Sequence, residues 1–180
     1  MPISYKIGKK EIKSWIESVI TGPEFVILDL GCGKGTYGEL IESPCVKIGV
    51  DAVDYSKAGN WKCKYTQSII ADIRNTTSYL HTVQGKESLC ILGDVLEHLT
   101  VSDAQKLISR LKEAVSYILV AVPYLYPQSS KNTYEVHRQD DLTHDLFMTR
   151  YPGFHLQHQV SRKQSPIYGY YTWSKIGNSV

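Results

Sequence analysis

The feature that most constrains this chain is an apolar strand that runs directly into a glycine-rich loop. Residues 25–28 are Phe-Val-Ile-Leu, a continuous apolar run typical of a strand that is covered on both faces. The chain continues as Asp29-Leu-Gly-Cys-Gly-Lys-Gly35, with a glycine at every second position from Gly31 onward. Because glycine lets the backbone turn sharply and pass close to a ligand, this segment predicts the strand and loop of a nucleotide-cofactor site.

Short apolar runs alternate with stretches of helical periodicity along most of the chain. Further strands are predicted over residues 46–50, 68–71, 88–93, 117–122, 155–161 and 167–173, and helices over residues 9–21, 36–42, 76–84, 102–115 and 139–150. Such alternation favours a mostly parallel sheet with helices on its faces. The last two strands are joined by a link too short for a crossover helix, so they should pair antiparallel. We therefore predict a three-layer α/β sandwich with a mostly parallel seven-stranded sheet and an antiparallel C-terminal hairpin.

The size of the chain fits one domain that can bury its own core. We expect a single domain over residues 1–180, in which residues 1–22 form an N-terminal helix, residues 23–123 a cofactor-binding half, and residues 124–180 a substrate-side half with the closing hairpin. The expected substrate pocket is built from the N-terminal helix, a polar loop over residues 54–66 that contains Trp61, and residues 124–145. An open cleft or a site completed by a second copy in a homodimer are both compatible with such a small fold.

Four of the first five predicted strands end at an aspartate, namely Asp29, Asp51, Asp72 and Asp94. In open α/β sheets a ligand lies beyond the carboxyl ends of the strands, and an acid at the end of the second strand can bind a ribose diol. Each aspartate could instead cap a helix or lie in solvent. Their shared position beside the glycine loop favours contact with the cofactor.

The spacing of the glycines separates two classes of cofactor. Dinucleotide sites use G-x-G-x-x-G, which would need a glycine where this chain has Thr36. The segment from Asp29 to Gly35 instead resembles motif I of the class I S-adenosylmethionine-dependent methyltransferases, in their small-molecule (type 11/12-like) branch. The resemblance continues in order through Gly49-Val-Asp51, Ala71-Asp72-Ile73, Asp94-Val-Leu-Glu-His-Leu99, Val122-Pro123 and Tyr151-Pro-Gly-Phe154.

This resemblance implies S-adenosylmethionine as the cofactor and assigns a part of it to each segment. The glycine loop would pass the methionine end, whose ammonium would meet Asp29 or the carbonyl of Gly93. Asp51 would bind the ribose hydroxyls and Asp72 the adenine amino group, with Ile73 against the adenine face. The implied cofactor-binding residues are Asp29, Gly31, Cys32, Gly33, Gly35, Asp51, Ala52, Asp72, Ile73, Gly93 and Asp94.

The sequence gives weaker signals for the residues that would contact the methyl acceptor. His98 is the candidate general base because it should lie over the methyl-transfer cleft beside Glu97, although the two could also be a capping pair with a hydrogen-bonded histidine. The candidate substrate residues are Glu97, Tyr124, Tyr126 and Tyr134, and core packing is the alternative for the tyrosines. Four further histidines (His137, His144, His155 and His158) are irregularly spaced. We expect them to be solvated or hydrogen-bonded, and we expect no metal.

The composition excludes some partners of such an enzyme. The formal net charge is only +2 and no basic stripe is present, and the Asp-Pro-Pro-Tyr type of motif of amino-methylating DNA enzymes is absent after the fourth strand. Nucleic acid is therefore disfavoured, and a small molecule or a protein is the expected acceptor. The N-terminus lacks an apolar leader and no cysteine pair has metal-ligand spacing, which favours a cytoplasmic protein without membrane contact. The alternatives are a nicotinamide-dependent oxidoreductase and a cofactor-binding protein without transferase activity.

Overall fold

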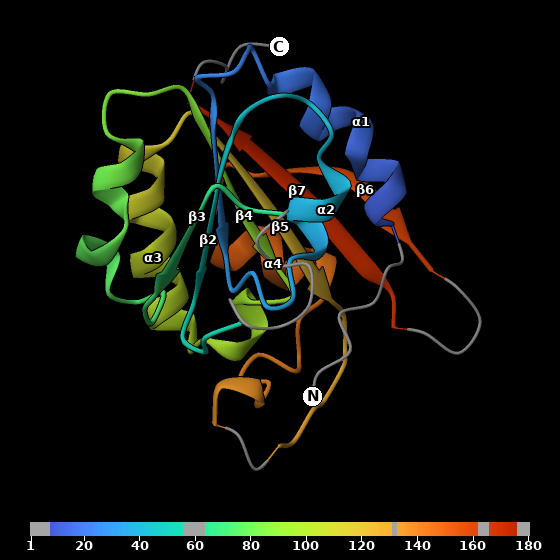
Figure 1. The fold of residues 1–180 in the computed structure, drawn as a ribbon. Coiled ribbons are helices and arrows are strands. Elements are labelled where there is room, and N and C mark those ends of the chain that lie inside the picture. Colours follow the sequence, from blue (N-terminus) through green and yellow to red (C-terminus); the bar gives the residue numbers. More distant parts are fainter. Residues whose placement is uncertain (1–7, 56–63, 131–132, 162–165, 176–180) are drawn as a thin grey trace.

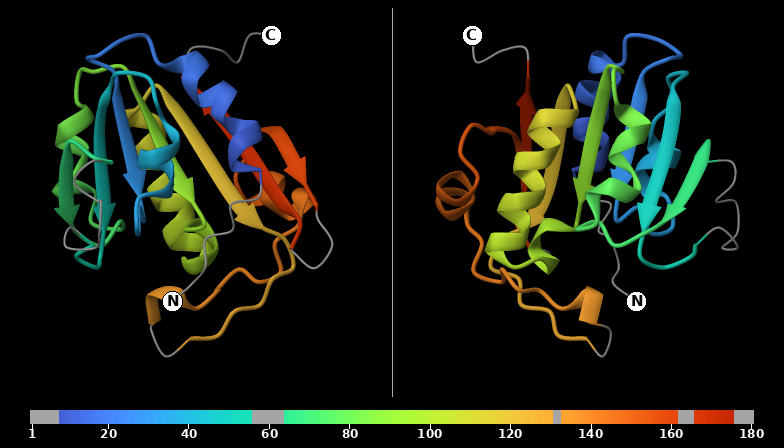
Figure 2. Two further views of the ribbon diagram at one scale, coloured as in Figure 1. Left: turned by 45° about the vertical axis from the view of Figure 1, so that its right-hand side comes forward. Right: turned by 90° about the vertical axis from the view of Figure 1, so that its left-hand side faces the viewer.

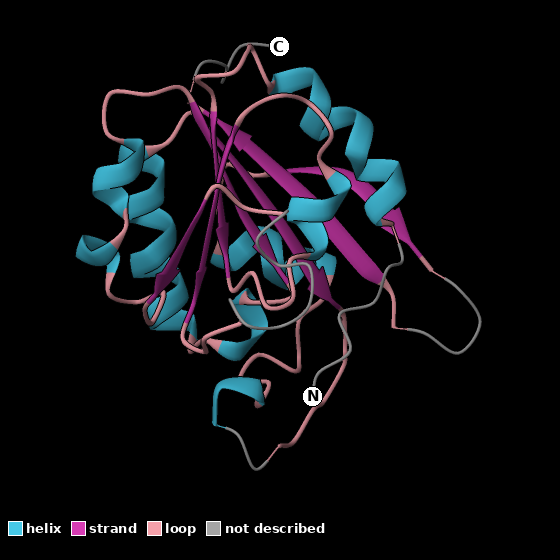
Figure 3. Cartoon of the chain, viewed as in Figure 1, coloured by secondary structure: helices cyan, strands magenta, loops and turns pink. Residues whose placement is uncertain are grey.

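A seven-stranded sheet runs through the middle of the chain (Figure 1; Figure 3). The structure is a computed structural model that describes residues 8–55, 64–130, 133–161 and 166–175. The strands are β1 Val26–Leu30, β2 Val46–Asp51, β3 Gln67–Ile70, β4 Ser88–Gly93, β5 Tyr117–Pro123, β6 His155–Val160 and β7 Tyr168–Ser174. Their order is β3-β2-β1-β4-β5-β7-β6, and all pairs are parallel except those that involve β7. The predicted fold class and its antiparallel C-terminal hairpin are confirmed.

Helices cover both faces of the sheet (Figure 2). The α-helices are α1 Lys9–Val19, α2 Thr36–Leu40, α3 Val101–Ala114 and α4 His144–Arg150, and the 3-10 turns are η2 Thr76–Ser78, η3 Leu80–Val83, η4 Leu96–His98 and η5 Thr133–Glu135. Helices α1 and α2 pack on one face, and α3, α4 and the η2–η3 segment pack on the other. The three layers match the predicted sandwich.

Strand β1 lies inside the sheet between β2 and β4, and this position explains why four of its five residues are apolar. Val26, Leu28 and Leu30 point into the core beneath α3, while Ile27 points into the core beneath α1. All four side chains are fully buried. Full burial of one such side chain contributes roughly 1.5–3 kcal/mol, so β1 is anchored from both sides and delivers Asp29 and the glycine loop to a fixed position.

Two predicted helices differ most from the structure. The predicted helix over residues 76–84 is two 3-10 turns, because Tyr79 adopts a non-helical backbone and its buried side chain donates a hydrogen bond to the carbonyl of Ile73. The predicted helix over residues 139–150 begins only at His144, where the Thr143 side chain accepts the Leu146 N–H at 3.2 Å. Gln139, at its expected start, is buried in a polar network instead.

The arrangement brings the carboxyl ends of the parallel strands together at one edge of the sheet, the lower edge in Figure 1. Trp61 and most of the predicted loop over residues 54–66 lie outside the described residues. In the part of the chain that the structure describes, no helix combines the length and the apolar character that a membrane crossing requires.

Candidate cofactor-binding site

The glycine loop after β1 depends on the backbone freedom of glycine. Gly31, Gly33 and Gly35 have φ angles of +68°, +49° and +82°, in the left-handed region that other residues rarely adopt. A Cβ atom on Gly31 would lie 2.4 Å from a methyl carbon of Val95, whereas a Cβ on Gly33 would meet no atom within 4 Å. The loop is thus tightly packed at Gly31 and open at Gly33.

Asp51 fastens this loop to the end of β2. One carboxylate oxygen accepts the Gly33 N–H at 2.9 Å, and the other accepts the Val53 N–H at 2.9 Å. Burial raises the pKa of Asp51, and the backbone hydrogen bonds partly offset this effect. Each oxygen retains a lone pair, so the carboxylate can accept further hydrogen bonds from a ligand.

Asp29 lies at the end of β1 and is nearly inaccessible to solvent, with a relative exposure of 2%. Burial raises the pKa of Asp29 to about 7, although the hydrogen bond from the Tyr65 hydroxyl and the charge of Lys9 both favour the ionised form. The carboxyl group therefore changes its protonation state near neutral pH.

This buried carboxyl group should make the stability of the protein depend on pH. In the folded chain Asp29 holds its proton up to about pH 7, whereas an unfolded chain releases it near the ordinary aspartate pKa of 3.8. Stability is therefore greatest below the unfolded pKa and falls as the pH rises through the folded pKa. For a folded pKa of about 7, wild type should lose roughly 2 kcal/mol between pH 5 and pH 8 relative to Asp29→Asn. Urea unfolding of both proteins at the two pH values measures this difference, and parallel pH profiles would refute it.

The ends of β3 and β4 supply two further aspartates. Asp72 follows β3 and accepts hydrogen bonds from the Arg74 side chain, with a distance of 2.9 Å between Nε and Oδ1. Asp94 follows β4 and has a φ angle of +59°, an uncommon conformation that marks many functional sites. An oxygen of Asp94 lies 3.5 Å from the ammonium of Lys9, which is itself 4% exposed. Lys9 thus places a buried cation among these acids.

These groups surround one cavity of about 880 Å³. The predicted cofactor residues that line it are Asp29, Gly31, Cys32, Gly33, Asp51, Asp72, Ile73, Gly93 and Asp94. The predicted acceptor-side residues that line it are Glu97, His98, Tyr126 and Tyr134. Thirteen of the sixteen predicted site residues therefore come together in one place.

Three predicted site residues do not line this cavity: Gly35, Ala52 and Tyr124. At Gly35 an added Cβ would lie 2.9 Å from the Tyr65 ring, so this glycine serves close packing behind the loop. Tyr124 is buried and its hydroxyl hydrogen-bonds with the hydroxyl of Tyr171. Its position matches the core-packing alternative for this aromatic residue.

The predicted acceptor side of the cavity is lined by the η4 turn and by residues from the ranges 126–130 and 133–138. The carbonyl of Glu97 accepts the N–H groups of Arg138 and Gln139 at 2.7 and 3.1 Å. These two bonds place His137 beside His98, with ring centroids 4.7 Å apart and edge to face. Burial lowers the pKa of both histidines, so both rings are neutral near pH 7.

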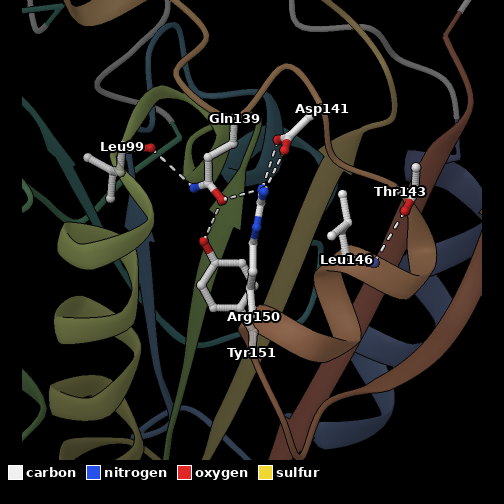
Figure 4. A network of polar contacts seen from close by, with 7 residues as sticks. All are labelled: Leu99, Gln139, Asp141, Thr143, Leu146, Arg150 and Tyr151. Carbon is white, nitrogen blue, oxygen red and sulfur yellow. Dashed lines mark hydrogen bonds and ion pairs between the residues drawn. The ribbon is translucent and has the colours of Figure 1, made fainter.

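A buried amide, Gln139, holds this half of the site in place (Figure 4). Its Nε2 donates to the carbonyls of Leu96 and Leu99 at 2.9 and 3.1 Å. Its Oε1 accepts the Tyr151 hydroxyl at 2.7 Å. The turn that carries Glu97 and His98 is therefore fixed by a side chain from a distant part of the sequence.

Several residues that line the cavity were not singled out from the sequence, although all but Tyr168 lie in the segments expected to build the pocket: Lys9, Tyr55, His137, Arg138 and Tyr168. Lys9 is the first residue of an amphipathic helix, and no local pattern distinguishes it from a solvated lysine. His137 was expected to be solvated or hydrogen-bonded, and its ring does hydrogen-bond to the Tyr126 carbonyl at 2.6 Å. Its place in the cavity follows from the tertiary contacts of its segment alone.

No family model matches the chain, and no curated protein sequence matches it. Solved structures do share its fold. Small RNA methyltransferase HEN1 matches with a TM-score of 0.67 and 13% identity, over 100% of this chain and 28% of that chain. A 1,6-didemethyltoxoflavin-N1-methyltransferase of Burkholderia thailandensis, with 1,6-didemethyltoxoflavin and S-adenosylhomocysteine bound, matches with a TM-score of 0.64 and 14% identity, over 96% and 80% of the two chains. An S-adenosylmethionine-dependent methyltransferase from Clostridium acetobutylicum matches with a TM-score of 0.60 and 11% identity, over 96% and 93%.

This chain has the class I S-adenosylmethionine-dependent methyltransferase fold. Within this methyltransferase fold, the cavity lies at the carboxyl edge of the sheet, where β1 and β4 meet beside the glycine loop. The predicted resemblance is thus confirmed at the level of the fold, on structures that share little sequence with the chain.

Proposed function

We propose that this protein is an S-adenosylmethionine-dependent methyltransferase. The observation that carries the proposal is the single cavity in which an open glycine loop meets carboxyl groups from the ends of β1, β2, β3 and β4. The methyltransferase fold supports it, because several structures of this fold hold S-adenosylhomocysteine.

The charges around the cavity suit this cofactor. S-adenosylmethionine carries a positive sulfonium, a positive ammonium and one negative carboxylate, so its net charge is positive, and Asp29, Asp51 and Asp94 all lie along the loop side of the cavity. A nicotinamide dinucleotide would bring two negative phosphates to the same place, which would be unfavourable beside three carboxyl groups. The site therefore fits the methyl donor better than it fits a dinucleotide.

The residues of the chain would mainly bind the cofactor and the acceptor, orient them, and exclude water. When bound, S-adenosylmethionine supplies an electrophilic methyl group that needs little further activation. Asp51, already held by two backbone N–H groups, would accept the ribose hydroxyls, and Asp72 with Ile73 would contact the adenine. Alignment of an acceptor atom with the methyl group is the remaining requirement.

The acceptor would lie against Glu97, His98, Tyr126 and Tyr134. We infer a small molecule or a protein as the acceptor and not nucleic acid, because the chain has a formal net charge of only +2. The fold itself leaves the acceptor open, since its neighbours include a small RNA methyltransferase and a 1,6-didemethyltoxoflavin methyltransferase. His98 has a neutral ring with one nitrogen bonded to the Val136 carbonyl, so its other nitrogen can accept a proton or bind an ion.

Calorimetric titration tests the cofactor directly. We expect S-adenosylhomocysteine and S-adenosylmethionine to bind one per chain, with dissociation constants in the micromolar range or below, about −8 kcal/mol, and NAD not to bind. Tight binding of NAD without S-adenosylhomocysteine would overturn the proposal. Incubation with fractionated metabolites and proteins then separates an enzyme, which converts the cofactor to S-adenosylhomocysteine, from a binding protein, which does not.

A further inference from the structure

A second cluster of chemistry-bearing side chains lies on the acceptor side of the cavity. Glu97 and His98 come from the η4 turn, and His137 comes from the segment that returns to it. One ligand atom from each of the three lies within 4.8 Å of the other two. Two ligands with bonds of about 2.1 Å to one ion are at most about 4.2 Å apart, so small side-chain rotations would bring all three onto one ion.

The hydrogen bonds of the two histidines set their tautomers. His98 Nδ1 lies 3.3 Å from the Val136 carbonyl, and His137 Nδ1 lies 2.6 Å from the Tyr126 carbonyl. A carbonyl oxygen only accepts, so each Nδ1 carries the proton and each Nε2 presents a lone pair. Metal-binding histidines have this arrangement, in which the second ring nitrogen is fixed by a carbonyl or a carboxylate.

The carboxyl group of Glu97 provides independent support for a ligand at this place. Glu97 is 1% exposed, and among the residues that the structure describes its Oε2 has no hydrogen-bond partner. Leaving a buried polar atom unsatisfied costs about 1–3 kcal/mol, and buried carboxylates are generally paired or bound to a metal. A cation between Glu97 and the histidines would satisfy this oxygen.

We propose that Glu97, His98 and His137 form a binding site for one divalent transition-metal ion. Two imidazole nitrogens and one carboxylate oxygen favour ions such as Zn²⁺ or Co²⁺ over Mg²⁺ and Ca²⁺, which prefer oxygen ligands. Three protein ligands leave coordination positions open, and all three residues line the cavity. In this arrangement His98 is a ligand and not a general base. All three ligands come from this chain, so ion binding can be measured with no cofactor present.

The test is metal binding by the full-length chain after treatment with a chelator. We expect calorimetry to show one Zn²⁺ bound per chain, and Co²⁺ to give a visible absorption band that Zn²⁺ removes and Mg²⁺ does not. Glu97→Gln, His98→Asn and His137→Asn should each weaken binding by about tenfold or more. His155→Asn, which removes an exposed histidine on β6, is the matched control and should bind as wild type does.

Separate readouts keep the result interpretable. Circular dichroism and S-adenosylhomocysteine titration of each variant report whether the fold and the cofactor half are intact. A variant that retains both and loses the ion supports the proposal, and His137→Asn is the best placed to do so because its residue lies outside regular helices and strands. Absence of stoichiometric binding by wild type, or unchanged binding in all three folded variants, would overturn it. Either result leaves the cofactor proposal standing on its own titration.

Discussion

Replacing Asp51 with asparagine is expected to weaken S-adenosylhomocysteine binding by about 10- to 100-fold. Hydrogen bonds to a charged group contribute about 1.5–3 kcal/mol, and each 1.4 kcal/mol is about tenfold in affinity. Each oxygen of Asp51 already accepts a backbone N–H, so the amide nitrogen of asparagine must face one of two donors. The substitution therefore removes the charge and also breaks one of the two backbone hydrogen bonds that hold this side chain in place.

The matched control is Asp141→Asn, which removes an exposed carboxylate that pairs with Arg150 and does not line the cavity. Calorimetry should give this control the affinity of wild type. Thermal unfolding of both variants shows whether Asp51→Asn remains folded at the temperature of the titration. If a folded Asp51→Asn protein binds S-adenosylhomocysteine as tightly as wild type, Asp51 has no role in binding the ribose.

The second large effect is expected on stability, from Phe147→Ala in α4. Phe147 is fully buried, and its ring stacks on Tyr171 of β7 with centroids 3.7 Å apart. It also contacts Phe154 edge to face and the ring of Tyr151. Truncation of such a buried aromatic residue typically costs about 3–5 kcal/mol, because the cavity that remains collapses only in part.

Urea unfolding measures this loss of stability, with Leu156→Ala as the control. Leu156 is an apolar residue on β6 that is 39% exposed, and its truncation should cost less than about 1 kcal/mol. A similar loss in the two variants would show that the aromatic cluster between α4 and β7 contributes little beyond ordinary surface packing.

Sequence alone could predict the glycine-loop side of the cavity, because its signals are local. The run from Val26 to Gly35 contains its own strand, turn and loop, and the φ angles of its glycines confirm the turn. Asp51 and Asp72 could be placed because parallel strands end at the same edge of a sheet. These inferences need only the positions of the strands along the sequence.

The rest of the cavity could be predicted only in part, because the sequence indicates which segments line it but not which side chains meet there. Lys9 reaches Asp94 across the fold, and His137 reaches Glu97 and His98 through backbone bonds between segments distant in sequence. Such contacts depend on how a loop returns to the sheet, which periodicity does not encode. The same holds for Gln139. It was predicted as the first residue of a helix, and nothing in that pattern indicated that its amide is buried and hydrogen-bonded to the η4 turn.

The way in which the segment 126–138 is attached has a consequence for engineering. Its first end is fixed where the Leu125 N–H meets the Leu142 carbonyl at 2.9 Å, and its last residue donates its own N–H to the Glu97 carbonyl. Between these two anchors, residues 126, 128, 133–135 and 137 line the predicted acceptor side of the cavity, and none of them belongs to the glycine loop. The segment is therefore suited to exchange in chimeric proteins. Replacing it while both anchors are retained should change which acceptor binds and leave the glycine loop intact.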